Sequence, residues 1–201
     1  MSWTLRDIRR TYRWMAWPYD RLFRRGYQGL RQESLKGLSL RPDATVLLVG
    51  VGTGLDLRFV PPAGLILAVD LSPAMLRRAA QAPASSAVDA LIGDGARLPF
   101  PDASVSAAIF HLVLCSAPGG RALLQEAARV LEPGAPVAIL DHFAPRGPMR
   151  KWRRLASRYS WVLGTHLDRR FEPMLQGLPF EVQNDKSLAG GYYRAIRLRR
   201  R

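Results

Sequence analysis

The stretch VLLVGVGTGLDLRFVPPAGLILAVD, residues 46–70, determines the expected fold and the expected site. A short apolar run enters the glycine loop Gly50-Val51-Gly52-Thr53-Gly54, and a second apolar run ends in Asp70. Glycines let a backbone turn tightly and approach a ligand without a Cβ in the way. An acid at the end of the second strand can accept hydrogen bonds from both hydroxyls of a ribose. The stretch therefore predicts a site for a nucleoside cofactor.

The spacing of the glycines narrows the kind of nucleotide site. The dinucleotide fingerprint needs a third small residue, GxGxxG or GxGxxA, and here Leu55 occupies that position. The chain contains no GxxxxGKS or GxxxxGKT motif, which argues against a P-loop NTPase. An ordinary strand-to-helix turn is the alternative for the glycine loop taken alone.

The segments after Asp70 add further markers of the same kind of site. Ser72 can cap the N-terminus of a helix whose first residue is Pro73. A third apolar strand, 88–92, leads into Gly93-Asp94-Gly95-Ala96, and a fourth strand is expected at 105–112.

The motifs VGVGTG, VDLSPAML and GDGARLPFPDASV follow one another in this order and resemble the class I S-adenosylmethionine-dependent methyltransferases over residues 45–142. The resemblance implies that the glycine loop faces the methionine part of the cofactor, that Asp70 holds the ribose hydroxyls and that Asp94 accepts from the adenine amino group. Leu71 or Met75 would pack on the adenine. A carboxylate that only caps its own Gly-Asp-Gly turn is the alternative for Asp94. The expected cofactor residues are Gly50, Val51, Gly52, Thr53, Gly54, Asp70, Leu71, Met75, Asp94, Gly95, Ala96 and His111, and the product would be S-adenosylhomocysteine.

Alternating strands and helices predict an α/β fold with a mostly parallel sheet covered on both faces. Strands are expected at 45–49, 65–70, 88–92, 105–112, 136–142, 180–186 and 192–199, and helices at 3–17, 20–37, 73–82, 120–131 and 148–163. The resemblance implies a Rossmann-like order, 3-2-1-4-5-7-6, with strand 7 antiparallel. We expect amphipathic cap helices in residues 1–40 and a single methyltransferase domain in residues 41–201.

Length and composition limit the number of domains, the cellular compartment and the kinds of site that we expect. A chain of 201 residues, 48% of them apolar, can bury one sizeable core. No apolar run is long enough for a transmembrane helix, and the N-terminus lacks a signal-peptide core. Cys115 is the only cysteine, which excludes an intrachain disulfide and favours a cytoplasmic protein with a buried thiol. His111, His142 and His166 are scattered along the chain, so we expect no metal site.

The net charge of +14 is unevenly distributed. Residues 1–41 hold 10 basic and 3 acidic side chains, and residues 142–201 hold 14 basic and 4 acidic ones. The middle, residues 42–141, holds 6 basic and 9 acidic side chains. In this fold class the flanks form the substrate side, so the charge indicates an anionic partner, either a membrane surface or a nucleic acid.

Residues 3–17 read as an amphipathic helix with an apolar stripe, a basic stripe and tryptophans at its edge. This combination is typical of a helix that lies in a membrane interface. A cap helix that packs on the domain and exposes its arginines to water is the alternative. The expected membrane residues are Trp3, Arg6, Arg9, Arg10, Arg13, Trp14 and Trp17.

Nucleic acid is the less favoured anionic partner. The chain carries no zinc knuckle, KH loop or RNP-like aromatic strand. The sequence HLVLCSAP after the fourth strand also differs from the motifs that resemblance would give for base methyltransferases. We therefore expect an anionic membrane and no nucleic acid.

The flanking segments WPYDRLFRRGYQGLRQESL, VLEPGAPVAILDHFAPRGPMR and LPFEVQNDKSLAGGYYRAIRL are similar to those of the bacterial phosphatidylethanolamine N-methyltransferases. The resemblance implies methylation of a phospholipid amine toward phosphatidylcholine. We expect a monomer that is peripherally bound to the inner face of the cell membrane. The loop from Cys115 to Gly120 departs from that pattern. Quinone-type C-methyltransferases and small-molecule O- or N-methyltransferases are alternatives, and so is a non-catalytic membrane- or RNA-binding protein.

Methyl transfer to an amine needs a neutral nucleophile and a proton acceptor. Tyr19 is the candidate to line the methyl site, because its hydroxyl can accept from an amine and its ring can face a cation. His142 can take the proton, and Asp141 can orient it. The candidates for the lipid phosphate are Arg146, Arg150, Lys151, Arg153, Arg154, Tyr192 and Tyr193.

Overall fold

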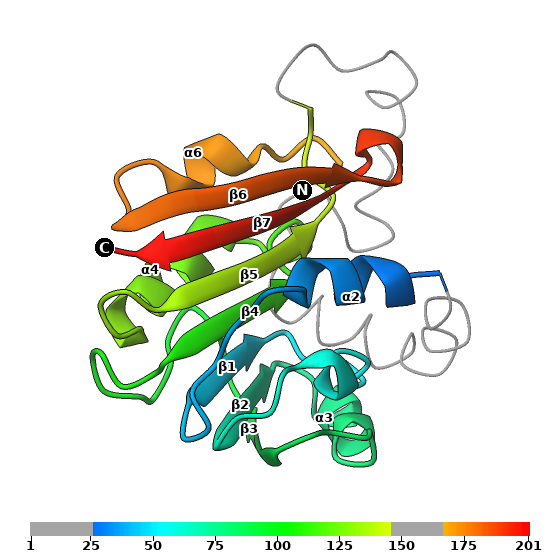
Figure 1. Ribbon diagram of the computed structural model, residues 1–201, viewed down its shortest axis with the longest axis vertical. Helices are drawn as coiled ribbons and strands as arrows, with labels where there is room; N and C mark the ends of the chain where they lie inside the picture. The colour runs from blue at the N-terminus through cyan, green and yellow to red at the C-terminus, as the bar shows by residue number, and fades with distance from the viewer. Residues whose placement is uncertain (1–25, 146–166) are drawn as a thin grey trace.

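The computed structural model describes residues 26–145 and 167–201, in which seven strands form one sheet in the order β3-β2-β1-β4-β5-β7-β6 (Figure 1). Neighbouring strands from β1 to β5 pair in parallel, whereas β7 runs antiparallel to both β5 and β6. The expected fold class and strand order are therefore confirmed. The strands are β1 (Thr45–Val49), β2 (Leu65–Asp70), β3 (Ala87–Ile92), β4 (Ala107–His111), β5 (Pro136–Asp141), β6 (Phe180–Leu188) and β7 (Tyr193–Arg200).

The helices agree with expectation in part. The described helices are α2 (Gln28–Leu35), α3 (Pro73–Ala79), α4 (Gly120–Val130) and α6 (Phe171–Leu175), with 3-10 turns η1 (Leu57–Phe59) and η3 (Ala189–Gly191). The five residues of α6 are too few to give a periodic signal, so the sequence did not predict it. The helices expected at 3–17 and 148–163 lie outside the described residues. Within the described ranges, no helix has the length and apolar character to cross a bilayer.

The sheet has a separate apolar cluster on each face, because successive side chains of a strand point to opposite sides. In β1, Leu47 and Val49 belong to the cluster with α4 and α6, whereas Val46 and Leu48 belong to the cluster with α2 and α3. Figure 1 shows α2 crossing in front of the sheet and α4 behind it. The strands β1 and β4 are thus buried on both faces, as expected of the centre of a parallel sheet.

The strand order reverses at β1, whose neighbours are β2 on one side and β4 on the other. The connections that leave the carboxyl ends of β1 and β4 therefore go to opposite sides and open a crevice between them. In a sheet of this kind the crevice is the usual ligand site. It is also where the glycine loop and the end of β4 are found.

Gly54, in the glycine loop, has no room for a side chain. Its φ is +81°, and an added Cβ would lie 2.8 Å from Cβ of Ala82 and 2.9 Å from Cα of Ala79. This close approach packs the loop onto the end of α3. In the dinucleotide fingerprint, the third small residue allows close packing between the loop and the helix. Here Gly54 allows that close packing.

We predict that Gly54→Ala lowers the free energy of unfolding by about 2–4 kcal/mol, because backbone strain adds to overpacking. Gly190→Ala is the matched control, since φ is +66° there and nothing lies within 4 Å of the added Cβ. The control should cost about 1–2 kcal/mol. Denaturant unfolding of both variants measures the difference, and equal losses would contradict the packing role of Gly54.

Candidate active site

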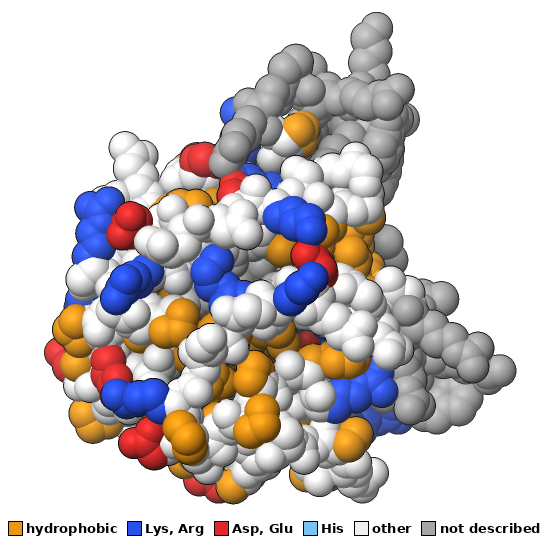
Figure 2. All heavy atoms as spheres, in the orientation of Figure 1, with side chains coloured by type: hydrophobic (Ala, Val, Ile, Leu, Met, Phe, Trp, Pro, Cys, Tyr) orange, Lys and Arg blue, Asp and Glu red, His pale blue; other side chains and the backbone are white. Residues whose placement is uncertain are grey.

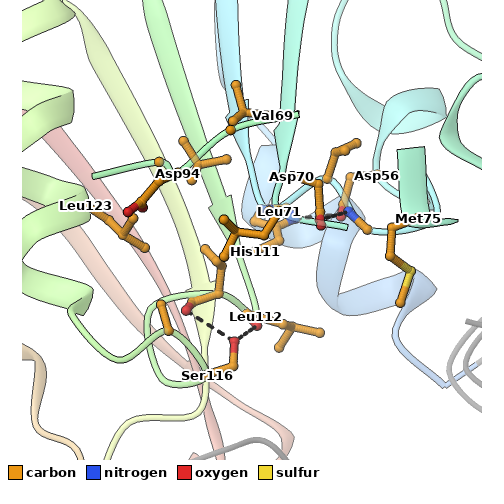
Figure 3. A pocket seen from close by; sticks show the side chains of 18 of the residues that line it. Asp56, Val69, Asp70, Leu71, Met75, Asp94, His111, Leu112, Ser116 and Leu123 are labelled. Atoms are coloured by element: carbon orange, nitrogen blue, oxygen red, sulfur yellow. Dashed lines mark hydrogen bonds and ion pairs between the residues drawn. The ribbon is translucent and has the colours of Figure 1, made fainter. Parts of the chain in front are cut away.

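A cavity of about 330 Å³ lies at the carboxyl ends of β1, β2 and β4. Figure 3 shows Asp70, Leu71 and Met75 on one side of it and Asp94 and Leu123 on the other. The lining includes these expected cofactor residues: Gly50, Val51, Gly52, Thr53, Asp70, Leu71, Met75, Asp94, Gly95, Ala96 and His111. Gly54 is the expected cofactor residue that does not line the cavity, because it faces α3.

The glycine loop is shaped by close contacts and by a carboxylate. Gly50 donates a backbone hydrogen bond to Val69 O at 2.8 Å, and a Cβ on Gly50 would lie 2.6 Å from Cγ2 of Val113. Gly52 N donates to Asp70 Oδ2 at 2.9 Å. The loop thus keeps a bare backbone along the cavity wall, as a ligand that lies against main-chain atoms requires.

Asp70 is the carboxylate that joins two loops at the cavity rim. Oδ2 accepts from Gly52 N, and Oδ1 accepts from Ser72 N at 2.8 Å. Burial raises the pKa of Asp70 above its ordinary value, and the backbone donors only partly offset this. A partly buried carboxylate in a cavity, with part of its hydrogen-bonding capacity unused, can accept from ligand hydroxyls.

The far wall holds Asp94 in a tight turn. Asp94 Oδ1 accepts from Ala96 N at 2.9 Å, which is the local bond expected of an Asp in a Gly-Asp-Gly turn. On the opposite wall, Ser72 Oγ accepts from Met75 N at 3.4 Å and Pro73 opens α3, which confirms the predicted cap. This cap holds the buried Met75 at the cavity wall.

The loop after β4, residues 112–118, forms a second wall. Leu112 has a positive φ of 57°, which is uncommon for a non-glycine residue. Ser116 Oγ donates to Leu112 O at 3.0 Å (Figure 3), and Arg169 donates to the carbonyl oxygens of Leu114 and Ala117. The strained turn therefore persists because surrounding bonds fix it, as is common beside ligand sites.

Asp141 and His142 lie at the carboxyl end of β5, beside this loop and outside the cavity lining. Asp141 Oδ2 accepts from Cys115 N at 3.0 Å, and Oδ1 accepts from His142 N at 2.8 Å. His142 Nδ1 lies 2.9 Å from the same Oδ1. The carboxylate therefore orients the imidazole, as the sequence suggested, and also anchors the loop.

Tyr192 and Tyr193 pack on His142, and Tyr27 packs on Tyr193; we call these four residues the aromatic cluster. The ring of His142 stacks with Tyr192 at 6.3 Å between centroids and meets Tyr193 edge-on at 6.1 Å. The hydroxyl oxygens of Tyr193 and Tyr27 are 2.6 Å apart. Burial and the bond to Tyr27 both raise the pKa of Tyr193, so this phenol stays neutral at physiological pH.

Cys115, Asp141 and His142 come together although they are distant in sequence. One ligand atom from each lies within 4.8 Å of the others, and all three residues are buried. Both oxygens of Asp141 already accept backbone N–H groups, and Cys115 Sγ lies 3.6 Å from His142 O as a donor. The arrangement is that of a hydrogen-bonded anchor.

Sequence reasoning missed two charged residues of the cavity wall, Arg31 on α2 and Asp56 after the glycine loop. Arg31 gave no signal because it is one of many arginines in a basic flank. Asp56 follows Gly54 by two residues, so its position beside the loop was the available clue.

Several expected site residues lie outside the described ranges. These are Tyr19, the phosphate candidates Arg146, Arg150, Lys151, Arg153 and Arg154, and the membrane candidates Trp3, Arg6, Arg9, Arg10, Arg13, Trp14 and Trp17.

Comparisons with known proteins agree with this site. A family model described as a methyltransferase domain matches residues 47–139. The phosphatidylethanolamine N-methyltransferase of Cereibacter sphaeroides is 28% identical, over 96% of this chain and 98% of the relative. The 2-phytyl-1,4-naphtoquinone methyltransferase of Synechococcus elongatus is 29% identical, over 82% of this chain and 78% of the relative.

A solved structure shares the fold and contains the cofactor product. The geranyl diphosphate C-methyltransferase of Streptomyces coelicolor, in complex with S-adenosyl-L-homocysteine, has a TM-score of 0.68 and 16% identity over 86% of this chain and 77% of that one. The glycine loop, Asp70 at the end of β2 and the matched methyltransferase domain all indicate the same family. The chain therefore belongs to the S-adenosylmethionine-dependent methyltransferases.

Proposed function

We propose that this enzyme methylates the amine of phosphatidylethanolamine and of its methylated intermediates, toward phosphatidylcholine, at a membrane surface. The observation that carries the proposal is the extent of the match to the Cereibacter sphaeroides enzyme, 96% of this chain and 98% of the relative. That match includes the flanks on both sides of the methyltransferase domain at 47–139. Substrate recognition in this fold resides in such flanks.

A quinone acceptor is the second candidate, because quinone methyltransferases also match the chain. The aromatic cluster favours an amine. The faces of tyrosine rings attract ammonium groups, and the carboxylate of Asp141 adds a negative charge next to His142. A neutral quinone ring can stack on these rings, but it carries no positive charge for the ring faces or the carboxylate to attract.

We propose that the cofactor binds in this cavity in the orientation that the sequence suggested. We place the methionine part along Gly50–Thr53 and the ribose hydroxyls on Asp70. Leu71 and Met75 would pack on one face of the adenine, and Asp94 would accept from its amino group. Gly95, Ala96 and His111 would complete the walls. When bound, the cofactor supplies an electrophilic methyl group on a sulfonium.

The chemical demand on the protein is positioning and proton removal. A lipid amine must lose its proton before it can attack, and an imidazole side chain can accept a proton. Asp141 holds Nδ1 of His142, so Nε2 would receive the proton. The ring contacts of Tyr192 and Tyr193 with His142 favour a role at the amine over the phosphate role that the sequence suggested.

The charge distribution supports action at an anionic surface. Residues 1–25 and 146–166 contain 13 of the 30 lysines and arginines but only 2 of the 16 acids. On the face shown in Figure 2, the described Lys and Arg side chains are scattered among hydrophobic and acidic ones. We therefore propose that the two flanking segments bind the inner face of the membrane, with Arg146, Arg150, Lys151, Arg153 and Arg154 at the lipid phosphate.

The proposed reaction is tested by incubating the enzyme with methyl-labelled S-adenosylmethionine and vesicles of phosphatidylethanolamine with an anionic lipid. We expect label in the lipid phase and none when phosphatidylcholine replaces phosphatidylethanolamine. Parallel vesicles carry a desmethyl naphthoquinol as the competing acceptor. Label in the quinol alone, or in neither acceptor although the cofactor binds, would refute the proposed substrate.

Asp70→Asn should weaken the binding of S-adenosylhomocysteine about 10- to 100-fold, because a charge-assisted acceptor for the ribose is lost. Since burial raises the pKa of Asp70, wild-type affinity should also fall when the pH drops from neutral to mildly acidic. Asp89→Asn, at an exposed position on β3, is the control. Calorimetric titration measures both effects. Unchanged affinity in Asp70→Asn would exclude the carboxylate from the ribose site.

His142→Asn should lower kcat about 100- to 10,000-fold and leave the affinity for S-adenosylhomocysteine unchanged. The residual rate should rise with pH, because more of the lipid amine is then neutral. A purely structural role would reduce the rate equally at every pH. A rate close to that of the wild type would exclude His142 as the proton acceptor.

A further inference from the structure

The helix α2 presents two polar side chains to the carboxyl ends of the central strands. Arg31 and Ser34 are one helical turn apart, and each is at least 96% buried. A buried arginine needs a specific reason, because arginine is rarely buried without a partner. Arg31 also lines the cavity, about one turn of helix from Tyr27 in the aromatic cluster.

Asp56 is the partner of Arg31 and fixes its position. Asp56 Oδ1 accepts from Arg31 Nε at 2.8 Å and lies 2.7 Å from His111 Nδ1. Nε2 of His111 lies 3.1 Å from Ser34 Oγ, which ties the imidazole back to α2. Burial alone would raise the pKa of Asp56, but His111 and Arg31 outweigh it and hold the pKa below its ordinary value. The carboxylate is therefore ionised and keeps Arg31 in place.

The two outer nitrogens of the Arg31 guanidinium, Nη1 and Nη2, take no part in the bond to Asp56. Among the described residues, Arg31 donates one hydrogen bond, from Nε, while its guanidinium also carries Nη1 and Nη2. These nitrogens belong to a side chain that is 4% exposed and lies at the cavity wall. Arg31 lines the cavity, and a planar guanidinium matches the two oxygens of a carboxylate.

We propose that Arg31 binds the carboxylate of the amino-acid part of the cofactor, and that Asp56 and His111 hold the guanidinium in position for it. Arg31 lines the same cavity as Gly50 and Thr53, along which we place the methionine part, and its partner Asp56 follows that loop in the chain. The carboxylate is the anionic group at that end of S-adenosylmethionine. This inference concerns the cofactor and does not depend on which acceptor is methylated.

The proposal gives α2 a part in cofactor recognition. The adenosine part of the ligand contacts loops of the central sheet, whereas the carboxylate would contact a side chain from the N-terminal helix. A ligand without the amino-acid part would therefore occupy the cavity without engaging Arg31. Comparing ligands with and without the amino-acid part therefore shows whether Arg31 binds the carboxylate or only maintains the shape of the cavity.

The experiment compares three ligands by calorimetric titration: S-adenosylhomocysteine, its decarboxylated analogue and methylthioadenosine. In the wild type we expect S-adenosylhomocysteine to bind about 10- to 100-fold more tightly than the decarboxylated analogue. In Arg31→Met this advantage should disappear, while the affinity for methylthioadenosine changes less than about threefold. Arg31→Lys keeps the positive charge but loses the paired N–H donors of the guanidinium. It should therefore retain part of the preference for S-adenosylhomocysteine over its decarboxylated analogue.

Arg41→Met is the matched control, because Arg41 is 65% exposed and makes its ion pairs at the surface. It should bind all three ligands as the wild type does. Two results would overturn the proposal. One is equal affinity of the wild type for S-adenosylhomocysteine and its decarboxylated analogue, which needs no variant. The other is a folded Arg31→Met that loses affinity equally for S-adenosylhomocysteine and methylthioadenosine.

Discussion

Three carboxylates at the carboxyl edge of the sheet, two of them buried and one partly buried, hold the loops of this enzyme in place. Asp70 joins the glycine loop to the start of α3, and Asp141 anchors the loop after β4 through Cys115 N. Asp56 joins β4 to α2 through His111 and Arg31. Each charge is satisfied by backbone N–H groups or basic side chains, as a buried ion requires. Without them, the crevice at the strand-order reversal would have no fixed walls.

In the proposed reaction, this arrangement places the cofactor cavity and the acceptor residues in separate but adjacent regions. The cavity between β1, β2 and β4 is built from loops whose backbone is fixed before a ligand arrives. The aromatic cluster lies at the end of β5, and the loop after β4 borders both regions. A methyl transfer with a neutral leaving group depends mainly on alignment, so rigid walls on both sides are what the reaction needs from the protein. The loop after β4 is the element through which one region can position the other.

The sequence predicted the parts of the site that depend on local patterns. Asp70, Asp94 and the Ser72 cap are visible because the residues that define them are close neighbours in the chain. The pairs Arg31–Asp56 and Asp56–His111 are 25 and 55 residues apart, and nothing in either segment marks the contact. The contacts of Tyr192 and Tyr193 with His142, and of Tyr27 with Tyr193, were equally hidden, because they require α2 and β7 to lie beside β5. The strand order could be predicted from the family resemblance. These contacts form only when elements distant in the sequence pack together, so the sequence did not reveal them.

The most direct test of this account is a crystal structure of the enzyme with S-adenosylhomocysteine. The account predicts the ribose hydroxyls within hydrogen-bonding distance of the Asp70 carboxylate, the adenine between Met75 and the Asp94 loop, and the homocysteine carboxylate on the guanidinium of Arg31. It would be contradicted by a ligand whose ribose lies away from Asp70, or by an amino-acid part that points away from α2 while Arg31 contacts only Asp56.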